Sequence, residues 1–147
     1  MSLKEKLAED LKSSMKNKDT VRKNTVQLVR TAILQIEKDK KVTLEDEDII
    51  EVIAKQLKQR KDSLPEYEKS GREDLISELK REMEVLMEYL PQQLSEDELR
   101  PIVEEAVKST GAASMKDMGK VMAAVMPQVK GRADGRAINA IAKALLS

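Results

Sequence analysis

The chain has 147 residues, with 27 Lys and Arg balanced by 27 Asp and Glu, and it contains no Cys, His, Trp or Phe. This composition excludes disulfides, zinc sites built on Cys or His, a Cys nucleophile and a His general base. With 40% hydrophobic and 37% charged residues, we expect a helix-rich protein of one domain or two small ones. The sequence predicts no catalytic residue, no metal site and no cofactor.

No run of apolar residues approaches the length of about 20 that a membrane-spanning helix needs. The first residues, MSLKEKLAEDLK, alternate charged side chains with leucines and lack the apolar centre of a signal peptide. We therefore expect a soluble, cytoplasmic protein that does not bind membranes.

Helical patterns follow one another along the chain, and no stretch shows the sustained alternation of a strand. We therefore expect an all-α protein whose N-terminal domain, residues 1–92, contains about four helices. Ser2 and Glu5 form a capping pair for the first helix, and the second begins at Thr20. Their apolar positions predict the buried faces: Leu3, Leu7, Leu11 and Met15 in the first helix, and Val21, Thr25, Leu28, Val29, Ala32, Ile33 and Ile36 in the second.

A long third helix is expected to begin at Thr43, with Asp46 as its capping partner. The acidic run 45–48 favours a helix start, where the backbone dipole stabilises negative charge, over a cation site. Pro65 should kink or end this helix, because proline lacks an N–H group and clashes with the preceding turn. Gly71 is the expected stop, and a fourth helix then carries Leu75, Ile76, Leu79, Met83, Leu86 and Leu90.

The segment 91–94 is the expected junction between two domains, residues 1–92 and 93–147. Pro91 cannot continue a helix, and Ser95 with Glu98 forms the capping pair of a new one. The C-terminal domain should contain three short helices, of which the first ends at Gly111, the second lies between Ser114 and Pro127, and the third begins at Asp134.

Charge changes sign within this C-terminal part, although the whole chain is neutral. Residues 94–107 have five acidic side chains and one basic one, a net charge of −4, whereas residues 108–147 have seven basic and two acidic ones, a net charge of +5. A cationic surface on the last two helices could bind nucleic-acid phosphates, and an ordinary solvated face is the alternative. The seven basic residues are Lys108, Lys116, Lys120, Lys130, Arg132, Arg136 and Lys143.

The loop 130–135, KGRADG, is the most specific feature of the C-terminal part. Its glycines allow backbone N–H groups to approach a partner, the next helix start favours anions, and Lys130 and Arg132 add full charges. The alternative is a tight turn in which Asp134 caps the following helix. Both interpretations can hold together.

Four methionines, at positions 115, 118, 122 and 126, share one face of a short helix. Such a stripe is usually part of the core, although methionine also suits adaptable grooves that bind partners. Gly119 beside the stripe predicts close helix packing. The only aromatic residues, Tyr67 and Tyr89, lie outside the basic region, so any bound RNA should be folded and recognised through its backbone and shape.

Four segments resemble the GatB/YqeY family in order and spacing, and the resemblance to a stand-alone YqeY-like protein extends over essentially the whole chain. They are Gly71-Arg72-Glu73-Asp74-Leu75, Glu88-Tyr89-Leu90-Pro91, Met118-Gly119-Lys120-Val121-Met122 and Gly131-Arg132-Ala133-Asp134-Gly135. The resemblance implies an N-terminal helical domain and a small three-helix C-terminal domain. In the larger relatives, the B subunits of tRNA-dependent amidotransferases, the corresponding region follows a catalytic core, and its tail is associated with gripping tRNA.

The resemblance also implies an association with carbon-nitrogen ligase activity that uses glutamine as amido-N-donor. This chain lacks the catalytic core of the amidotransferase B subunit, so we expect a non-catalytic module that binds tRNA or a tRNA-handling enzyme and has no enzyme activity on its own. A helical protein-interaction adaptor without RNA binding is the alternative. The candidate tRNA-binding residues that match the family's tail are Gly119, Lys120, Lys130, Gly131, Arg132 and Gly135, and the charge pattern adds Lys116 and Arg136.

Overall fold

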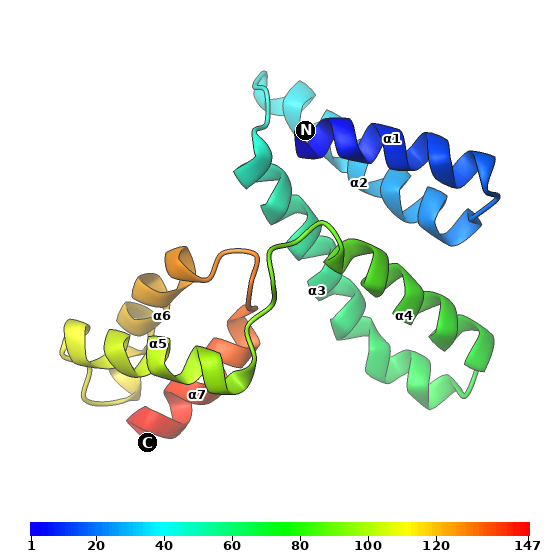
Figure 1. Cartoon of the computed structure of the whole chain (residues 1–147). Helices are drawn as coiled ribbons and strands as arrows, with labels where there is room; N and C mark the ends of the chain where they lie inside the picture. Colours follow the sequence, from blue (N-terminus) through cyan, green and yellow to red (C-terminus); the bar gives the residue numbers. More distant parts are fainter. The chain divides into compact units, whose positions relative to one another are not determined.

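The computed structural model describes all 147 residues, and every regular element in it is a helix, which confirms the all-α prediction (Figure 1). The chain divides into two compact units, Met1–Leu90 and Pro91–Ser147, and each unit has its own apolar core. The two units are therefore described one after the other. Independent folding of the expected domains, residues 1–92 and 93–147, stays a prediction.

The N-terminal unit contains two helical hairpins. Helix α1 packs along α2, α3 packs along α4, and α2 also contacts both α3 and α4. Their bounds are Leu3–Lys16 for α1, Thr20–Lys40 for α2, Asp46–Ser70 for α3 and Glu73–Met87 for α4. The buried core of this unit draws on all four helices and on the loop before α3, and it consists of Leu7, Val26, Val29, Ile33, Leu44, Ile49, Ile53, Leu57, Val85, Leu86 and Tyr89.

Helix α3 begins two residues later than the sequence predicts. Its N-cap is Glu45, which exchanges hydrogen bonds with Asp48 in a capping box, so the predicted start at Thr43 is wrong. Asp46, the expected partner of Thr43, instead accepts a hydrogen bond of 3.0 Å from the backbone N–H of Leu3. The acidic run therefore serves the starts of two helices, α3 and α1, because both present unpaired N–H groups there.

Pro65 does not end α3, which continues to Ser70. Pro65 lies on the exposed side of the helix, where water can hydrate a carbonyl group that has lost its N–H partner. The helix ends at Gly71, which adopts the left-handed conformation with φ of 68° and confirms the predicted stop.

Three side chains expected in the core of this unit are exposed. Met15 is 57%, Leu28 51% and Leu75 38% accessible. In α1 the apolar residues recur at a strict spacing of four, and each such step turns about 40° beyond a full helical turn, so the stripe drifts away from the buried face. The small Ser14 is buried in place of Met15, and its hydroxyl group donates to the carbonyl oxygen of Leu11 at 2.9 Å.

The C-terminal unit has three short α-helices, as the sequence predicts, with a 3₁₀ turn at each end of the middle one. Ser95 and Glu98 form a reciprocal capping box at the start of α5, and Gly111 ends α5 with φ of 67°. The bounds are Glu96–Thr110 for α5, Met115–Asp117 for η1, Met118–Val125 for α6, Met126–Gln128 for η2 and Gly135–Leu146 for α7. The buried core is formed by Leu99, Val103, Ala106, Val121, Val125, Val129, Ile138, Ile141, Ala142 and Leu146.

None of the helices combines the length and the apolar character needed to cross a membrane.

Candidate nucleic-acid interface

The reversal of charge in the sequence corresponds to a division between helices. All five acidic residues of the segment 94–107 lie on α5, whereas six of the seven basic residues lie beyond α5, on η1, α6, the loop before α7, or α7 itself. The remaining basic residue, Lys108, occupies the last turn of α5. Arg132 is half-buried and the other six basic side chains are exposed. Water and ligands can therefore reach nearly all of this positive charge.

The loop 130–135 is a tight turn, which confirms the structural interpretation of its sequence. Gly131 adopts φ of 75°, a conformation that favours glycine. The N–H groups of Arg132 and Ala133 both donate to the carbonyl oxygen of Val129, at 2.7 and 3.2 Å. Asp134 caps α7 by accepting from the N–H of Ala137 at 3.0 Å. The N–H groups of Arg132, Ala133 and Ala137 are therefore used inside the turn and are not available to an anion.

The same loop is hydrogen-bonded to the segment that precedes α5. The side-chain amide of Gln93 donates to the carbonyl oxygen of Gly131 at 2.6 Å, and the N–H of Leu94 donates to the carbonyl oxygen of Arg132 at 2.9 Å. The guanidinium Nε of Arg132 donates in turn to the carbonyl oxygen of Gln92 at 3.0 Å. Arg132 therefore positions the start of the C-terminal unit, a role that its sequence context did not indicate.

Arg132 also influences the first turn of α5. Hydrogen bonds from the backbone and side chain of Ser95, helped by the charge of Arg132, lower the pKa of the Glu98 carboxyl group. Glu98 thus remains ionised under mildly acidic conditions and keeps the capping box closed. The loop and the start of α5 form one polar assembly.

The remaining candidates form a second group at the start of α6. Lys116 and Lys120 are exposed, and Lys120 Nζ lies 3.7 Å from Asp117 Oδ1. A hydrogen bond from the N–H of Ala113, together with the charge of Lys120, lowers the pKa of Asp117. The first group, Lys130, Gly131, Arg132, Gly135 and Arg136, lies in the loop and the first turn of α7, and α6 packs against α7.

Neither helical glycine in these groups is required by the packing. A Cβ atom at Gly119 would meet no atom within 4 Å, so the prediction of close helix packing at Gly119 is wrong. A Cβ atom at Gly135 would lie 3.7 Å from Met122 Cε, an ordinary contact. The surface at Gly119 is therefore open.

The methionine stripe divides between the core and the surface. Met118 and Met122 pack against the apolar core of the C-terminal unit. Met115 and Met126, at the two ends of the stripe, are 43% and 41% exposed. The prediction of a core face is thus confirmed for the central pair only.

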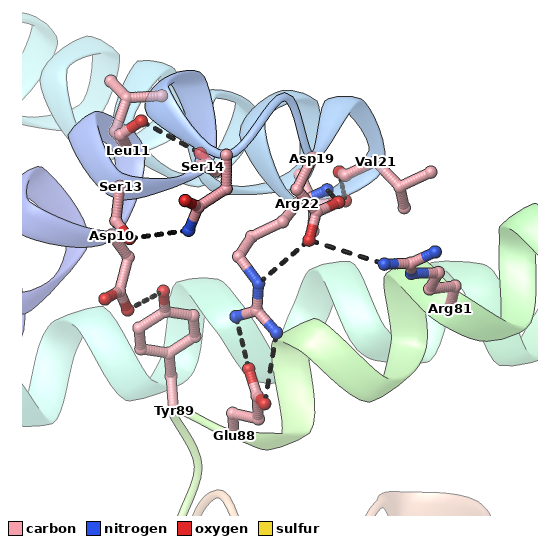
Figure 2. A network of polar contacts seen from close by, with 12 residues as sticks. Asp10, Leu11, Ser13, Ser14, Asp19, Val21, Arg22, Arg81, Glu88 and Tyr89 are labelled. Carbon is pink, nitrogen blue, oxygen red and sulfur yellow. Dashed lines mark hydrogen bonds and ion pairs between the residues drawn. The ribbon is translucent and has the colours of Figure 1, made fainter.

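The structure also contains a polar network in the N-terminal unit that the sequence did not predict (Figure 2). Arg22 on α2 binds both carboxylate oxygens of Glu88 at 2.5 and 3.2 Å, and its Nε lies 3.5 Å from Asp19. Arg81 contacts the same Asp19 carboxylate at 3.5 Å. The hydrogen bonds to Glu88 raise the pKa of the Arg22 guanidinium above its ordinary value. The network ties the end of α4 to the start of α2.

Tyr89 extends this network to α1. Its ring is buried, its hydroxyl group donates a hydrogen bond to the Asp10 carboxylate, and Lys6 Nζ lies 5.3 Å from the ring centre. Burial and the negative charge of Asp10 raise the pKa of the Tyr89 hydroxyl group. The Glu88-Tyr89 pair, which the sequence singled out as part of a family motif, therefore has a structural role at the end of α4.

Comparison with known proteins agrees with the resemblance seen in the sequence. Residues 4–146, nearly the whole chain, match the family described as Yqey-like protein. The chain belongs to the YqeY family. The match includes both polar assemblies described above, the loop before α7 and the Arg22–Glu88 network.

Similar YqeY-family proteins carry the name Altered inheritance of mitochondria protein 41, mitochondrial. The one from Pyrenophora tritici-repentis is 29% identical over 130 residues, which are 87% of this chain and 71% of that protein. Those from Kluyveromyces lactis and Vanderwaltozyma polyspora are 39% and 31% identical, over 56% and 76% of this chain and 45% and 64% of their own lengths. The chain thus aligns with only part of the length of these relatives.

The names of these relatives contradict the cytoplasmic location expected from the sequence. That expectation rested on the absence of an apolar segment and on a charged N-terminal helix. Both features describe a protein surface suited to water, and an aqueous compartment inside a mitochondrion requires the same surface. These features are the same in both compartments, and the prediction of a cytoplasmic location is wrong.

Proposed function

We propose that this YqeY-family chain is a non-catalytic module that binds folded tRNA, or an enzyme that handles tRNA, through its C-terminal unit. The observation that supports this proposal is the exposed positive charge beyond α5, in a unit whose acidic residues are concentrated on α5. Nucleic-acid affinity depends mainly on Lys and Arg side chains that neutralise phosphates. The resemblance of the C-terminal segments to the tail of tRNA-dependent amidotransferase B subunits supports tRNA as the nucleic acid.

In this proposal the candidate residues have different roles. Lys116, Lys130 and Arg136 present exposed charges that contact phosphates. Arg132 and Gly131 hold the loop in place, because their polar groups bond to the segment before α5. The absence of base-stacking aromatic residues in this unit supports recognition of the RNA backbone and shape.

Gly119 and Lys120 contribute to the same contact with the RNA backbone in different ways. The open surface at Gly119 gives an RNA backbone close access to α6, beside the charge of Lys120. Gly135 provides the same access at the first turn of α7, where only Met122 is near. The space at both glycines therefore supports this contact.

A titration of fluorescently labelled total tRNA with the full chain at moderate salt tests this proposal. The variant with Lys116→Glu and Lys130→Glu should bind at least about tenfold more weakly, because it removes two phosphate contacts and introduces repulsion. The control, Lys12→Glu with Lys38→Glu, makes the same charge change on α1 and α2 and should lose much less affinity. Absence of wild-type binding, or equal losses in the two variants, contradicts direct binding of tRNA by the C-terminal unit.

A second candidate function is supported by the exposed ends of the methionine stripe. Met115 and Met126 are flexible apolar side chains that suit the groove of a protein-interaction adaptor. Purification of the tagged chain after nuclease treatment distinguishes the two functions. Loss of all partners on nuclease treatment supports RNA binding. A protein partner that stays bound after nuclease treatment, and that no longer binds the Met115→Ser, Met126→Ser double variant, supports the adaptor.

A further inference from the structure

A cavity between α1 and α2 of the N-terminal unit has no part in the proposed function. It has a volume of about 270 Å³, and six residues line it: Lys4, Leu7, Arg30, Ile33, Leu34 and Glu37. Pockets that bind small molecules have volumes of roughly 300–1,000 Å³, so this one has room for a small ligand only. The lining is half apolar and half charged.

Two of the three charged side chains that line the cavity form an ion pair with each other, and the third has no partner. Lys4 Nζ lies 2.5 Å from Glu37 Oε2, and the same oxygen accepts from the N–H of Leu44 at 2.8 Å. The side chain of Arg30 is half-buried and forms no hydrogen bond or ion pair with the rest of the chain. Lys4 and Glu37 compensate each other, so the guanidinium of Arg30 leaves the cavity with one excess positive charge.

The apolar side chains lie next to this charge. Leu7 and Ile33 are buried core residues, whereas Leu34 is 63% exposed, the second-highest exposure among the large apolar side chains. An exposed leucine alone is common on protein surfaces. In a cavity that the unpaired side chain of Arg30 also lines, it provides an apolar contact near a positive charge.

We propose that this cavity binds a small organic carboxylate with a short apolar body. The planar guanidinium of Arg30 suits the two oxygens of a carboxylate, which it binds through two parallel hydrogen bonds. The apolar body then covers Leu34 and removes part of its surface from water. Phosphate would fit the charge of Arg30 but would leave Leu34 exposed, so a carboxylate with an apolar body fits both halves of the lining.

The test uses the full chain, sodium hexanoate as the probe and backbone amide NMR as the readout. Hexanoate should shift the amide signals around Arg30 and Leu34 with a dissociation constant of about 1 mM, a typical strength for so small a ligand. Hexan-1-ol, which lacks the charge, and acetate, which lacks the apolar body, should each bind at least about tenfold more weakly. Equal binding of hexanol and hexanoate, or no shift with hexanoate, contradicts the proposal.

Two variants locate the binding to this cavity. Arg30→Gln should weaken hexanoate binding at least about tenfold, whereas Lys38→Gln, the same charge change on an exposed side chain of α2, should leave it nearly unchanged. Leu34→Asp places a negative charge at the edge of the cavity and should abolish binding, and the exposure of Leu34 keeps this variant folded. Wild-type affinity in folded Arg30→Gln or in Leu34→Asp overturns the proposal. No tRNA enters this experiment, so its result is independent of the proposed function.

Discussion

At the scale of single residues, polar side chains of this protein act mostly by fixing backbone segments. Arg132 binds the carbonyl oxygen of Gln92, Asp46 binds the N–H of Leu3, and Glu37 binds the N–H of Leu44. The first two contacts join segments 40 and 43 positions apart, and the third ties the end of α2 to the loop before α3, seven positions away. Charge alone therefore does not identify a ligand-binding residue, and the half-buried Arg132 is a positioning residue within a basic region.

The pH dependence of stability should reveal the role of Glu37. The hydrogen bond from Lys4 and the one from Leu44 lower the pKa of its carboxyl group in the folded protein. The unfolded chain then binds more protons, so Glu37 stabilises the fold above the ordinary glutamate pKa, and this stabilisation is lost as the pH falls through the lower folded-state pKa. The free energy of unfolding of wild type should accordingly exceed that of Glu37→Gln by the full amount at neutral pH, and this difference should shrink in acid.

Urea unfolding of both proteins between about pH 7 and pH 3 measures this advantage. The control is Glu66→Gln, which neutralises an exposed glutamate on α3 away from the cavity. An advantage that stays constant over the whole pH range would contradict the assigned role of Glu37.

At the scale of helices, local signals predicted the ends of elements well. Ser95 with Glu98, Asp134, Gly71 and Gly111 lie at the predicted helix ends, because caps and left-handed glycines depend on residues within one turn. The features that the sequence did not predict correctly depend on residues far apart in the chain. The start of α3 was displaced because Asp46 serves α1, and the Arg22–Glu88 pair joins residues that are 66 positions apart.

The candidate site likewise combines local contacts, which the sequence predicts, with distant ones, which it does not. The turn at Gly131 and the cap at Asp134 follow from neighbouring residues, whereas the bond from Arg132 to Gln92 spans 40 positions. The cavity at Arg30 was missed because α1 and α2 contribute to it jointly, and no spacing within either helix predicts which side chain remains unpaired.

Two glycines of the C-terminal unit should respond in opposite ways to alanine. Gly119 lies in α6 with open space at its Cβ position, so Gly119→Ala should raise the free energy of unfolding by about 0.5–1 kcal/mol. Gly111 has φ of 67°, which disfavours a residue with a Cβ atom, so Gly111→Ala should lower the free energy of unfolding by about 1–2 kcal/mol. Thermal unfolding followed by circular dichroism measures both changes. A loss of stability in Gly119→Ala would show that α6 packs more closely than the structure indicates.

At the scale of the whole molecule, the net charge of zero conceals unequal surfaces. The C-terminal unit carries most of its negative charge on α5 and most of its positive charge beyond α5, while the N-terminal unit has a cavity lined by one unpaired arginine side chain. The two proposals therefore assign different anions to the two units: RNA phosphates to the C-terminal unit and a small carboxylate to the N-terminal one. Membership of the YqeY family sets the fold for both, but the chemistry resides in particular side chains.

In the proposed function, exposed Lys and Arg side chains of the C-terminal unit bind tRNA through its phosphates. The most direct measurement is the slope of log affinity against log salt concentration for labelled tRNA, in the wild type and in Lys116→Gln with Lys130→Gln. Each lost phosphate contact should reduce the magnitude of the slope by about 1, so the double variant should have a slope shallower by about 2. An unchanged slope, or wild-type affinity that does not depend on salt, would contradict the claim.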